Sequence, residues 1–348
     1  MRFLLDETQR DFARSLDALL TAAGTPAVVR SWSAGDTGPG RALWSRLADA
    51  GVFALSVPEK HGGMGPLPVE LVVSFIELGR HAVPGPVVET VAAAAFLDRL
   101  GDEPTAAELL PGVASGATVA SFCLLSPAGG IGGGPYALDA DAADLVLAVS
   151  GETVRRAGST GPVQPSTDPA RRLAEPVGGT VLAHGPEVTA AAAYATDVAA
   201  LATAAQALGL ARALLAHTVA YVRQRTQFGV AVGSFQAVKH RLADTLIGVE
   251  FAEPLLYGAA LGMAAGAPAD VPAAKVAACE AAYAAARTAL QLHGAVGYTE
   301  ELDLSLWIRK ARALRSAWGT PAACRARVLA TAAAGPEHTP EGAGECGN

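Results

Sequence analysis

One short segment of the sequence combines residue types suited to holding a phosphorylated cofactor: RTQFG, residues 225–229. Arg225 carries a planar, permanently charged guanidinium that can form paired hydrogen bonds with a pyrophosphate. Gln227 adds a neutral hydrogen-bonding side chain, and Phe228 offers an aromatic face for packing. Because the segment ends a long alanine-rich helical run, these side chains either contact a ligand or merely solvate a helix end.

Other signatures of catalysis or metal binding are weak. The glycine-rich GGIGGG at 129–134 precedes PYALDADAADLV, which has no helix signal, so a dinucleotide-binding loop is disfavoured. The sequence contains no GK[ST] P-loop, no GxSxG elbow and no HExxH motif. A metal site or disulfide framework is poorly supported, because no CxxC or Cys/His ligand spacing connects the four cysteines, Cys123, Cys279, Cys324 and Cys346.

Composition and charge restrict the class of protein. Of the 348 residues 51% are hydrophobic and only 5% aromatic, which suits close-packed helices in two or three domains. The net charge of −7 and the lack of a basic tract argue against nucleic acid as a partner. No window approaches the roughly 18 uninterrupted large apolar residues of a membrane span, and the charged N-terminus is unlike a secretory signal. We expect a cytoplasmic protein without membrane contact.

Three zones of different texture predict a mostly α, α+β fold. Residues 1–117 form amphipathic helical patterns. Residues 118–185 contain short β-rich runs, TVASFCLL, DLVLAVS and GTVLAH, between glycine- and proline-rich breakers, and these predict a small antiparallel sheet. Residues 186–333 are helical again, and the polar tail, 334–348, is expected to be flexible.

Three segments, in order, resemble the hallmark regions of the acyl-CoA dehydrogenase family. The first is LWSRLADAGVFALSVPEKHGGMG, and the second is AYVRQRTQFGVAVGSFQAVKHRLADTLIGVE, which contains Arg225. The third is LQLHGAVGYTEELDLSLWIRKARALRSAWGT, which ends at Thr320. Because the three blocks span almost the whole chain and keep the family's order, the resemblance is specific.

The resemblance implies an N-terminal helical domain, a shortened middle β-domain and a C-terminal four-helix bundle. It also implies FAD as cofactor, an acyl-CoA thioester as substrate and an electron-transfer acceptor. In the family, a carboxylate removes the α-proton while the flavin takes the β-hydrogen as hydride. The adenosine and pyrophosphate half of FAD would contact the chain that neighbours the flavin. By motif position, the FAD-contacting residues are Arg225, Gln227, Phe228, Gln236, Gln291, Gly294 and Thr320.

The catalytic glutamate of the family is missing from this sequence. Its usual position, directly before the Gly-Thr of the third block, is Trp318, and the alternative position on the preceding long helix is Ala199. Neither side chain can accept a proton. Asp197 is expected to face away from the flavin as an N-cap or first-turn acid, and Glu300 to match a structural acidic position of the family.

The flavin-ring half of the resemblance is eroded as well. The family's T-E-P-x-x-G-S-D-like loop corresponds to LLSPAGGIGGG, which keeps only Ser126, Pro127 and some glycines. Its W-[IV]-[TS] strand corresponds to LAVSGETVRRAGST, which has no tryptophan. The adenosine half is intact by comparison, so this chain resembles the non-catalytic subunits of heterotetrameric actinobacterial enzymes that act on steroid side-chain CoA esters.

The resemblance predicts a subunit that is inactive alone and supports FAD in a homologous, glutamate-bearing partner. The complex would desaturate a bulky or steroid-derived acyl-CoA. Two alternatives remain open at this point. The chain could be a homo-oligomeric flavoenzyme with altered chemistry on a specialised metabolite, or a non-enzymatic scaffold that keeps only the helical interface.

Overall fold

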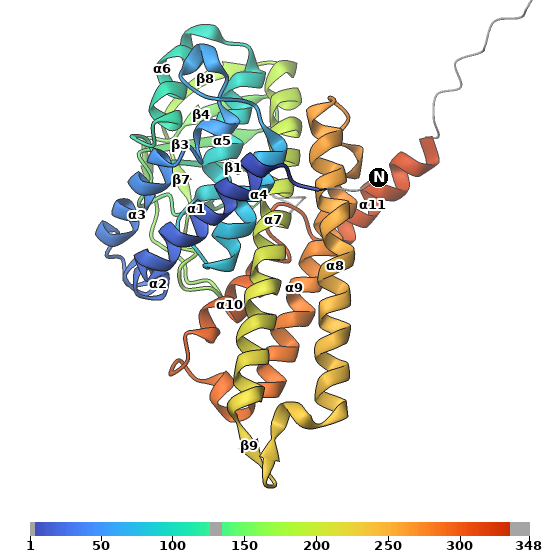
Figure 1. Ribbon diagram of the computed structural model, residues 1–348. Coiled ribbons are helices and arrows are strands. Elements are labelled where there is room, and N and C mark those ends of the chain that lie inside the picture. The colour runs from blue at the N-terminus through green and yellow to red at the C-terminus, as the bar shows by residue number, and fades with distance from the viewer. Residues whose placement is uncertain (1–3, 126–133, 335–348) are drawn as a thin grey trace, which may run out of the picture.

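The computed structural model describes residues 4–125 and 134–334, and the chain in these ranges is mostly helical with one small β region (Figure 1). Residues 126–133, which include Ser126, Pro127 and all but the last residue of GGIGGG, and residues 335–348 of the tail lie outside the described residues. The elements follow the order helices, strands, helices, which confirms the expected α+β fold. The N-terminal helices are α1 (Glu7–Ala23), α2 (Thr25–Ser33), α3 (Gly38–Asp49), α4 (Pro68–Arg80), α5 (Val87–Leu100) and α6 (Glu103–Ala114).

Local sequence explains the two contrasting kinds of N-terminal helix. Helix α1 begins with a capping box, in which the Asp6 side chain accepts from the Gln9 backbone and the Gln9 side chain accepts from Asp6. Its apolar stripe buries Leu16 and Leu20, as the helical spacing predicts. Helix α5 is instead buried almost all round, because its alanines let neighbouring elements approach closely from several sides.

The central sheet has four strands in the order β1 (Ala120–Leu124), β3 (Leu145–Ser150), β4 (Thr153–Arg156) and β8 (Thr180–His184). Strands β3, β4 and β8 pair antiparallel, but β1 and β3 pair parallel, with Ala120 opposite Leu145. The expectation of an antiparallel sheet was therefore wrong for one pair. The twenty residues between β1 and β3 give the chain room for the crossover that a parallel pair requires.

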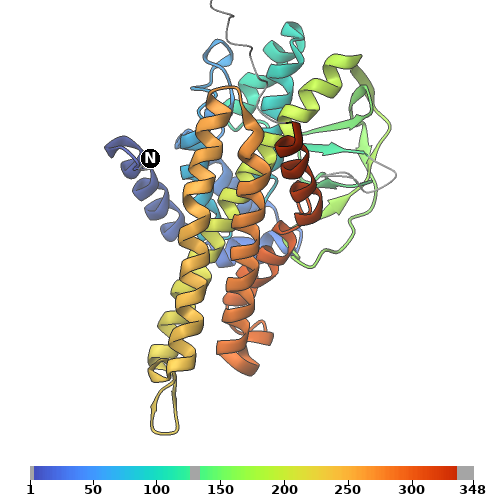
Figure 2. The ribbon, with the colours of Figure 1, turned by 90° about the vertical axis from the view of Figure 1, so that its right-hand side faces the viewer.

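The C-terminal region is a bundle of long helices. Helix α7 (Pro186–Gln224) runs the length of the molecule, and α8 (Gln236–Ala264) and α9 (Val271–His293) lie alongside it (Figure 2). Two shorter helices follow. Helix α10 (Leu304–Leu314) packs against α7 and α9, and α11 (Pro321–Ala334) contacts α9. The four helices α7–α10 match the expected bundle.

Glycines set the distance between the N-terminal helices and α7. A Cβ added at Gly209 would lie 1.9 Å from the Ile76 carbonyl oxygen, and one added at Gly79 would lie 2.1 Å from the Gln206 carbonyl oxygen. Each glycine therefore faces the backbone of the other helix across the contact between α4 and α7. This crossing fixes the N-terminal helices against the bundle core.

Two helices are long and apolar enough to cross a membrane by length and composition alone, which corrects the expectation that no such segment exists. They are α7 and α8, and the most apolar 18-residue window of each is 89% and 39% buried in the protein, respectively. The sequence argument counted only large apolar residues, whereas alanine supplies much of the hydropathy here. Helix α7 is thus a core helix, and α8 leaves much of its apolar surface uncovered.

Candidate functional site

Residues 225–229 form an exposed hairpin at the far end of the bundle (Figure 1). Strands β9 (Thr226–Gln227) and β10 (Val230–Ala231) pair antiparallel around the two-residue turn Phe228–Gly229. Both turn residues have positive φ, 53° and 78°, which matches the twist of a tight hairpin. This backbone conformation is sterically unfavourable for a residue other than glycine, yet Phe228 adopts it, and its side chain is 93% exposed. A large aromatic held in that way is suited to contact a ligand or another chain.

The surroundings of the hairpin favour a negatively charged group. Arg225 has no salt-bridge partner among the described residues, and the chain contains no aspartate or glutamate from 198 to 243. Gln236 is the first residue of α8, whose N-terminus lacks a side-chain cap. The free backbone N–H groups and positive dipole end of a long helix bind anions well.

Gln291 and Gly294 lie at the same end of the molecule as the hairpin, where α9 ends and η5 (Gly294–Tyr298) begins (Figure 1). The Tyr221 ring stacks on the His293 ring with centroids 4.1 Å apart, which fixes the end of α7 against the end of α9. Gly294 has φ 65°, a conformation that favours glycine. The bundle end therefore brings together six of the seven predicted FAD-contacting positions.

Thr320 is the position that the structure separates from the others. Its hydroxyl caps α11 by accepting from the Ala323 N–H at 3.2 Å. The neighbouring Gly319 carbonyl oxygen lies 3.4 Å from Lys275 Nζ. Lys275 and His293 are eighteen residues apart on α9, a distance of about 27 Å along a helix. Thr320 therefore belongs with Trp318 and not with the hairpin end.

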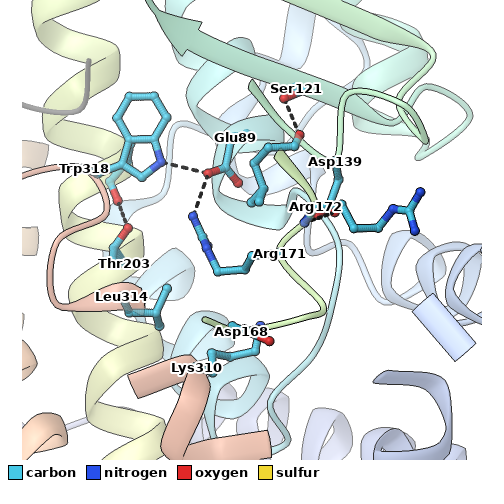
Figure 3. A network of polar contacts seen from close by, with 12 residues as sticks. Glu89, Ser121, Asp139, Asp168, Arg171, Arg172, Thr203, Lys310, Leu314 and Trp318 are labelled. Atoms are coloured by element: carbon cyan, nitrogen blue, oxygen red, sulfur yellow. Dashed lines mark hydrogen bonds and ion pairs between the residues drawn. The ribbon is translucent and has the colours of Figure 1, made fainter. Parts of the chain in front are cut away.

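Trp318, at the expected position of the base, points into the protein (Figure 3). Its indole Nε1 donates a hydrogen bond to Glu89 Oε1 at 2.9 Å. The ring stacks on Phe122 of β1, with centroids 5.8 Å apart and planes 8° from parallel. Its φ of 54° is uncommon for a residue other than glycine. Ala199, the alternative base position, is fully buried in α7. The two expected base positions are thus occupied by a packed indole and a buried methyl group, neither of which can accept a proton.

Lys275 holds the backbone on both sides of Trp318. Its buried ammonium donates to the Leu314 carbonyl oxygen at 3.0 Å and to the Gly319 carbonyl oxygen at 3.4 Å. It also donates to Cys279 Sγ at 3.2 Å. A buried charge is costly unless hydrogen bonds replace its hydration, and here main-chain carbonyls do so. The segment that carries Trp318 is thereby fixed to α9.

Glu89 is a site residue that sequence reasoning did not identify. The carboxylate lies buried on α5, receives the Trp318 hydrogen bond and is 3.9 Å from the Arg171 guanidinium (Figure 3). Its second oxygen, Oε2, is buried without a hydrogen-bond partner among the described residues. Burial and the nearby Glu89 raise the pKa of the Cys123 thiol to about 12. One signal was available in the sequence, a lone acid inside the apolar run VVETVAAAAFL.

The segment around Arg171 connects the β region to both helical regions through polar contacts. Buried Asp168 is 3.4 Å from Lys310 Nζ of α10. Buried Asp139 accepts hydrogen bonds from Trp32 Nε1 and from the Arg172 backbone N–H, both at 3.1 Å. Burial raises the pKa of Asp139 to about 7, against the opposing effect of these hydrogen bonds. These buried charged groups lie on the side of the interior that Trp318 faces through its hydrogen bond to Glu89 (Figure 3).

Asp197 was expected near the start of a helix, and this expectation was wrong. It lies well inside α7, buried, and accepts a hydrogen bond from Arg327 of α11 at 2.7 Å. Burial raises the pKa of Asp197, and Arg327 opposes that effect. The continuous α7 begins at Pro186, eleven residues earlier, so Asp197 cannot cap it. Glu300 forms an ion pair with Arg309, which agrees with a structural role.

Comparison with known proteins identifies the family. The N-terminal domain model of acyl-CoA dehydrogenases matches residues 6–117, and the C-terminal domain model matches residues 189–332. Acyl-CoA dehydrogenase IpdE2 of Mycolicibacterium smegmatis is 31% identical over 319 residues, which cover 91% of this chain and 96% of that protein. This chain belongs to the acyl-CoA dehydrogenase family.

Solved acyl-CoA dehydrogenase structures share the fold over the whole chain. Butyryl-CoA dehydrogenase from Megasphaera elsdenii matches with a TM-score of 0.84 at 23% identity, covering 96% of this chain and 100% of that one. The ChsE4–ChsE5 complex from Mycobacterium tuberculosis matches with a TM-score of 0.83 at 25% identity, covering 97% of this chain and 100% of the matched one.

Members of the acyl-CoA dehydrogenase family bind FAD, and the two ends of this chain differ in how well they suit it. The hairpin end offers an exposed aromatic side chain, an unpaired arginine and an uncapped helix N-terminus, which fit a nucleotide pyrophosphate. The interior beside Trp318 does not fit a flavin ring, because buried side chains of α5, β1 and α7 pack around the indole.

Proposed function

We propose that this chain is the subunit without a catalytic base in a heteromeric acyl-CoA dehydrogenase. A homologous partner would carry the glutamate and the flavin ring. This chain would hold the adenosine and pyrophosphate half of that FAD through its hairpin end. The complex would desaturate an acyl-CoA thioester, and this chain would be inactive alone.

The observation that carries the proposal is the hydrogen bond between Trp318 and Glu89. A tryptophan could have entered the base position as a loosely held surface residue, but it is buried, stacked and hydrogen-bonded instead. Glu89 is not free to replace the missing base, because one of its oxygens accepts from the indole and lies 3.9 Å from the Arg171 guanidinium. The interior of this chain therefore supports a structural role at the point where the family performs proton transfer.

The hairpin end supports the second half of the proposal. An arginine without an acidic partner gains from a ligand phosphate, to which it can donate two parallel hydrogen bonds. When FAD is bound there, its pyrophosphate supplies the negative charge that this end lacks. Arg225, Gln227 and Phe228 would position it from the hairpin, with Gln236, Gln291 and Gly294 beside them. Thr320, about 27 Å away along α9, is not part of this half-site.

The outer face of α8 supports association with another chain. Ile247, Phe251 and Leu255 recur every four residues along this helix and are exposed, and Leu246 adjoins them. An apolar stripe of this kind on a long helix is typical of a protein interface. We call these four residues the α8 stripe. The ChsE4–ChsE5 complex, which contains a chain of similar fold, is consistent with a homologous partner.

The substrate, the acceptor and the compartment remain expectations. The resemblance to heteromeric actinobacterial enzymes favours a bulky or steroid-derived acyl-CoA and an electron-transfer acceptor, and the sequence predicts a cytoplasmic location.

The test is to purify the chain alone and with a co-expressed homologous subunit that carries the family glutamate. Flavin absorbance and protein concentration give the FAD-to-chain ratio, and dye reduction with acyl-CoA gives activity. We expect the chain alone to contain no FAD and to be inactive. The complex should hold one FAD for each pair of unlike chains and be active. Replacing Arg225 with Ala should remove most of that FAD.

A matched control is Arg14→Ala, which removes an exposed arginine of α1, away from the hairpin end, and should leave the FAD content unchanged. A yellow, active homo-oligomer with one FAD per chain would overturn the proposal in favour of a homo-oligomeric flavoenzyme. Unchanged FAD in the Arg225→Ala complex would favour a scaffold that only retains the helical interface.

A further inference from the structure

A large pocket lies on a part of the molecule that the proposed function does not use. It has a volume of about 530 Å³ and opens between the end of α1, the start of α2, the end of α4, the middle of α7 and α10. None of the seven FAD-contacting positions and none of the residues around Trp318 lines it. Organic ligands of moderate size occupy pockets of this volume, whereas a single inorganic ion would leave most of it empty.

The charged groups exposed in the wall of this pocket are mainly positive. The walls carry two guanidinium groups, those of Arg80 and Arg212, whose side chains are 39% and 32% exposed. The carboxylate that lines the pocket, Glu77, is only 9% exposed. The other two acids that balance the arginines, Asp17 and Glu253, do not line the pocket.

Both arginines keep donors for a ligand. Arg80 contacts its two acids through Nη1, at 2.7 Å from Glu77 Oε2 and 3.4 Å from Asp17 Oδ1. Arg212 contacts Glu253 Oε2 through Nη2 at 2.6 Å. Within the described residues, Nε and one terminal nitrogen of each guanidinium make no hydrogen bond. Because a guanidinium has five N–H donors, each arginine can hold its acid and still bind an anion.

The rest of the pocket suits an organic body attached to the anion. Trp307 lies on one wall, with its Nε1 hydrogen-bonded to the Arg80 carbonyl oxygen at 2.8 Å. The His217 ring meets the Trp307 ring edge-on, with centroids 5.1 Å apart. Ala216 supplies exposed apolar surface, with the buried side chains of Leu20 and Ala213 behind the wall. An aromatic or aliphatic group can therefore pack here while its charged end faces the arginines.

A metal ion is the competing occupant, and the geometry disfavours it. Asp17, Glu77 and His81 present ligand atoms within 4.8 Å of one another. The Arg80 guanidinium, however, already contacts both carboxylates, and His81 Nε2 lies 2.8 Å from Asp17 Oδ1. A divalent cation would have to displace this positive group, so the acids are better explained as partners of Arg80.

We propose that this pocket binds a small organic anion, a molecule in which a carboxylate or phosphate is attached to an aromatic or apolar body. Arg80 and Arg212 hold the anionic group, and Trp307 packs against the body. The site is separate from the hairpin end, so it exists whether or not the chain supports a partner's FAD.

Calorimetric titration of the full chain with simple probes tests this site. Phenyl phosphate and benzoate should bind with a dissociation constant of about 1 mM or lower, while uncharged benzamide should not bind. Both substitutions Arg212→Gln and Ala216→Phe should weaken binding at least tenfold, the first by removing charge and the second by filling the pocket. If only the phosphate probe binds, the anionic group is a phosphate, and if only benzoate binds, it is a carboxylate.

Matched variants separate this site from the FAD half-site. Ala220→Phe changes an exposed alanine of the same helix outside the pocket, and it should leave binding unchanged. Arg225→Gln alters the hairpin end and should also leave it unchanged. Loss of binding in Arg225→Gln but not in Arg212→Gln would overturn the pocket proposal, because the probes would then occupy the hairpin end. Equal binding of benzamide and benzoate, or no binding of either anion, would overturn it as well.

Discussion

At the scale of single residues, the hydrogen bond from Trp318 to Glu89 distinguishes a fixed structural element from an accidental filler. Replacing Trp318 with Phe keeps an aromatic ring for stacking but leaves Glu89 Oε1 without its donor in a buried site. An orphaned buried acceptor costs about 1–3 kcal/mol beyond the loss of packing. We expect the free energy of unfolding, measured with urea, to fall by that amount more than in a control that loses only packing.

Trp44 provides that control. It is also buried and stacks on an aromatic ring, Phe53, with centroids 4.1 Å apart, but its Nε1 has no hydrogen-bond partner among the described residues. Trp44→Phe therefore removes the same atoms without breaking a hydrogen bond. Equal losses of stability in the two variants would mean that the bond to Glu89 contributes nothing, and that Trp318 only fills space.

The residue scale also shows the reach of sequence reasoning. The prediction that Trp318 and Ala199 occupy the family's base positions rests on motif spacing, because each position lies at a fixed offset from recognisable residues. The partner of Trp318 did not follow, because Glu89 is 229 residues away and lies on a helix whose pattern is simply apolar. The prediction for Asp197 was wrong for a related reason. The alanine-rich sequence of α7 does not show where the helix begins, so a residue inside the helix was interpreted as a cap.

At the scale of elements, the contact between α4 and α7 depends on two glycines. Gly209→Ala would place a methyl group 1.9 Å from the Ile76 carbonyl oxygen, so the helices would have to separate. Overpacking of this kind costs about 1–3 kcal/mol, which urea unfolding would measure as a loss of stability. In α8, Gly248→Ala is the matched control, because the nearest atom to the added Cβ is 3.9 Å away. That variant should be at least as stable as the wild type, since alanine favours helix more than glycine does. Equal stability of both variants would show that α4 and α7 can separate freely.

The elements themselves were largely predictable, whereas their pairing was not. Alternating and helical patterns located the three main β-rich runs and the helical zones, because those patterns depend on neighbouring residues. The parallel pairing of β1 and β3 depends on a long connection between them, for which local pattern carries no signal. The high hydropathy of α8 was missed because alanine was not counted, whereas the α8 stripe consists of large apolar residues whose exposure only the structure shows.

At the scale of the whole molecule, most of the exposed large apolar side chains lie away from the β region. The interior of the chain near the β region is closed by Trp318, while the opposite end and the outer face of α8 present exposed aromatic and apolar side chains. Exposing the Phe228 and Phe251 side chains to water does not stabilise a monomer, because apolar surface contributes to the free energy of folding only when it is buried. Association with another chain would cover both side chains, which is consistent with the proposed heteromeric assembly.

The α8 stripe gives this interpretation a direct test on the assembly. Phe251 lies at the centre of the α8 stripe and is 73% exposed. Phe251→Lys therefore places a charge in the proposed interface without disturbing the monomer core. We expect co-expressed complex carrying this variant to dissociate into smaller species, as measured by size-exclusion chromatography with light scattering. The monomer's circular dichroism should be unchanged. Leu329→Lys introduces the same charge at an exposed leucine of α11 and should leave the assembly intact. If Phe251→Lys keeps the full mass of the wild-type complex, the α8 stripe is not the interface, and the partner must be held by the hairpin end alone.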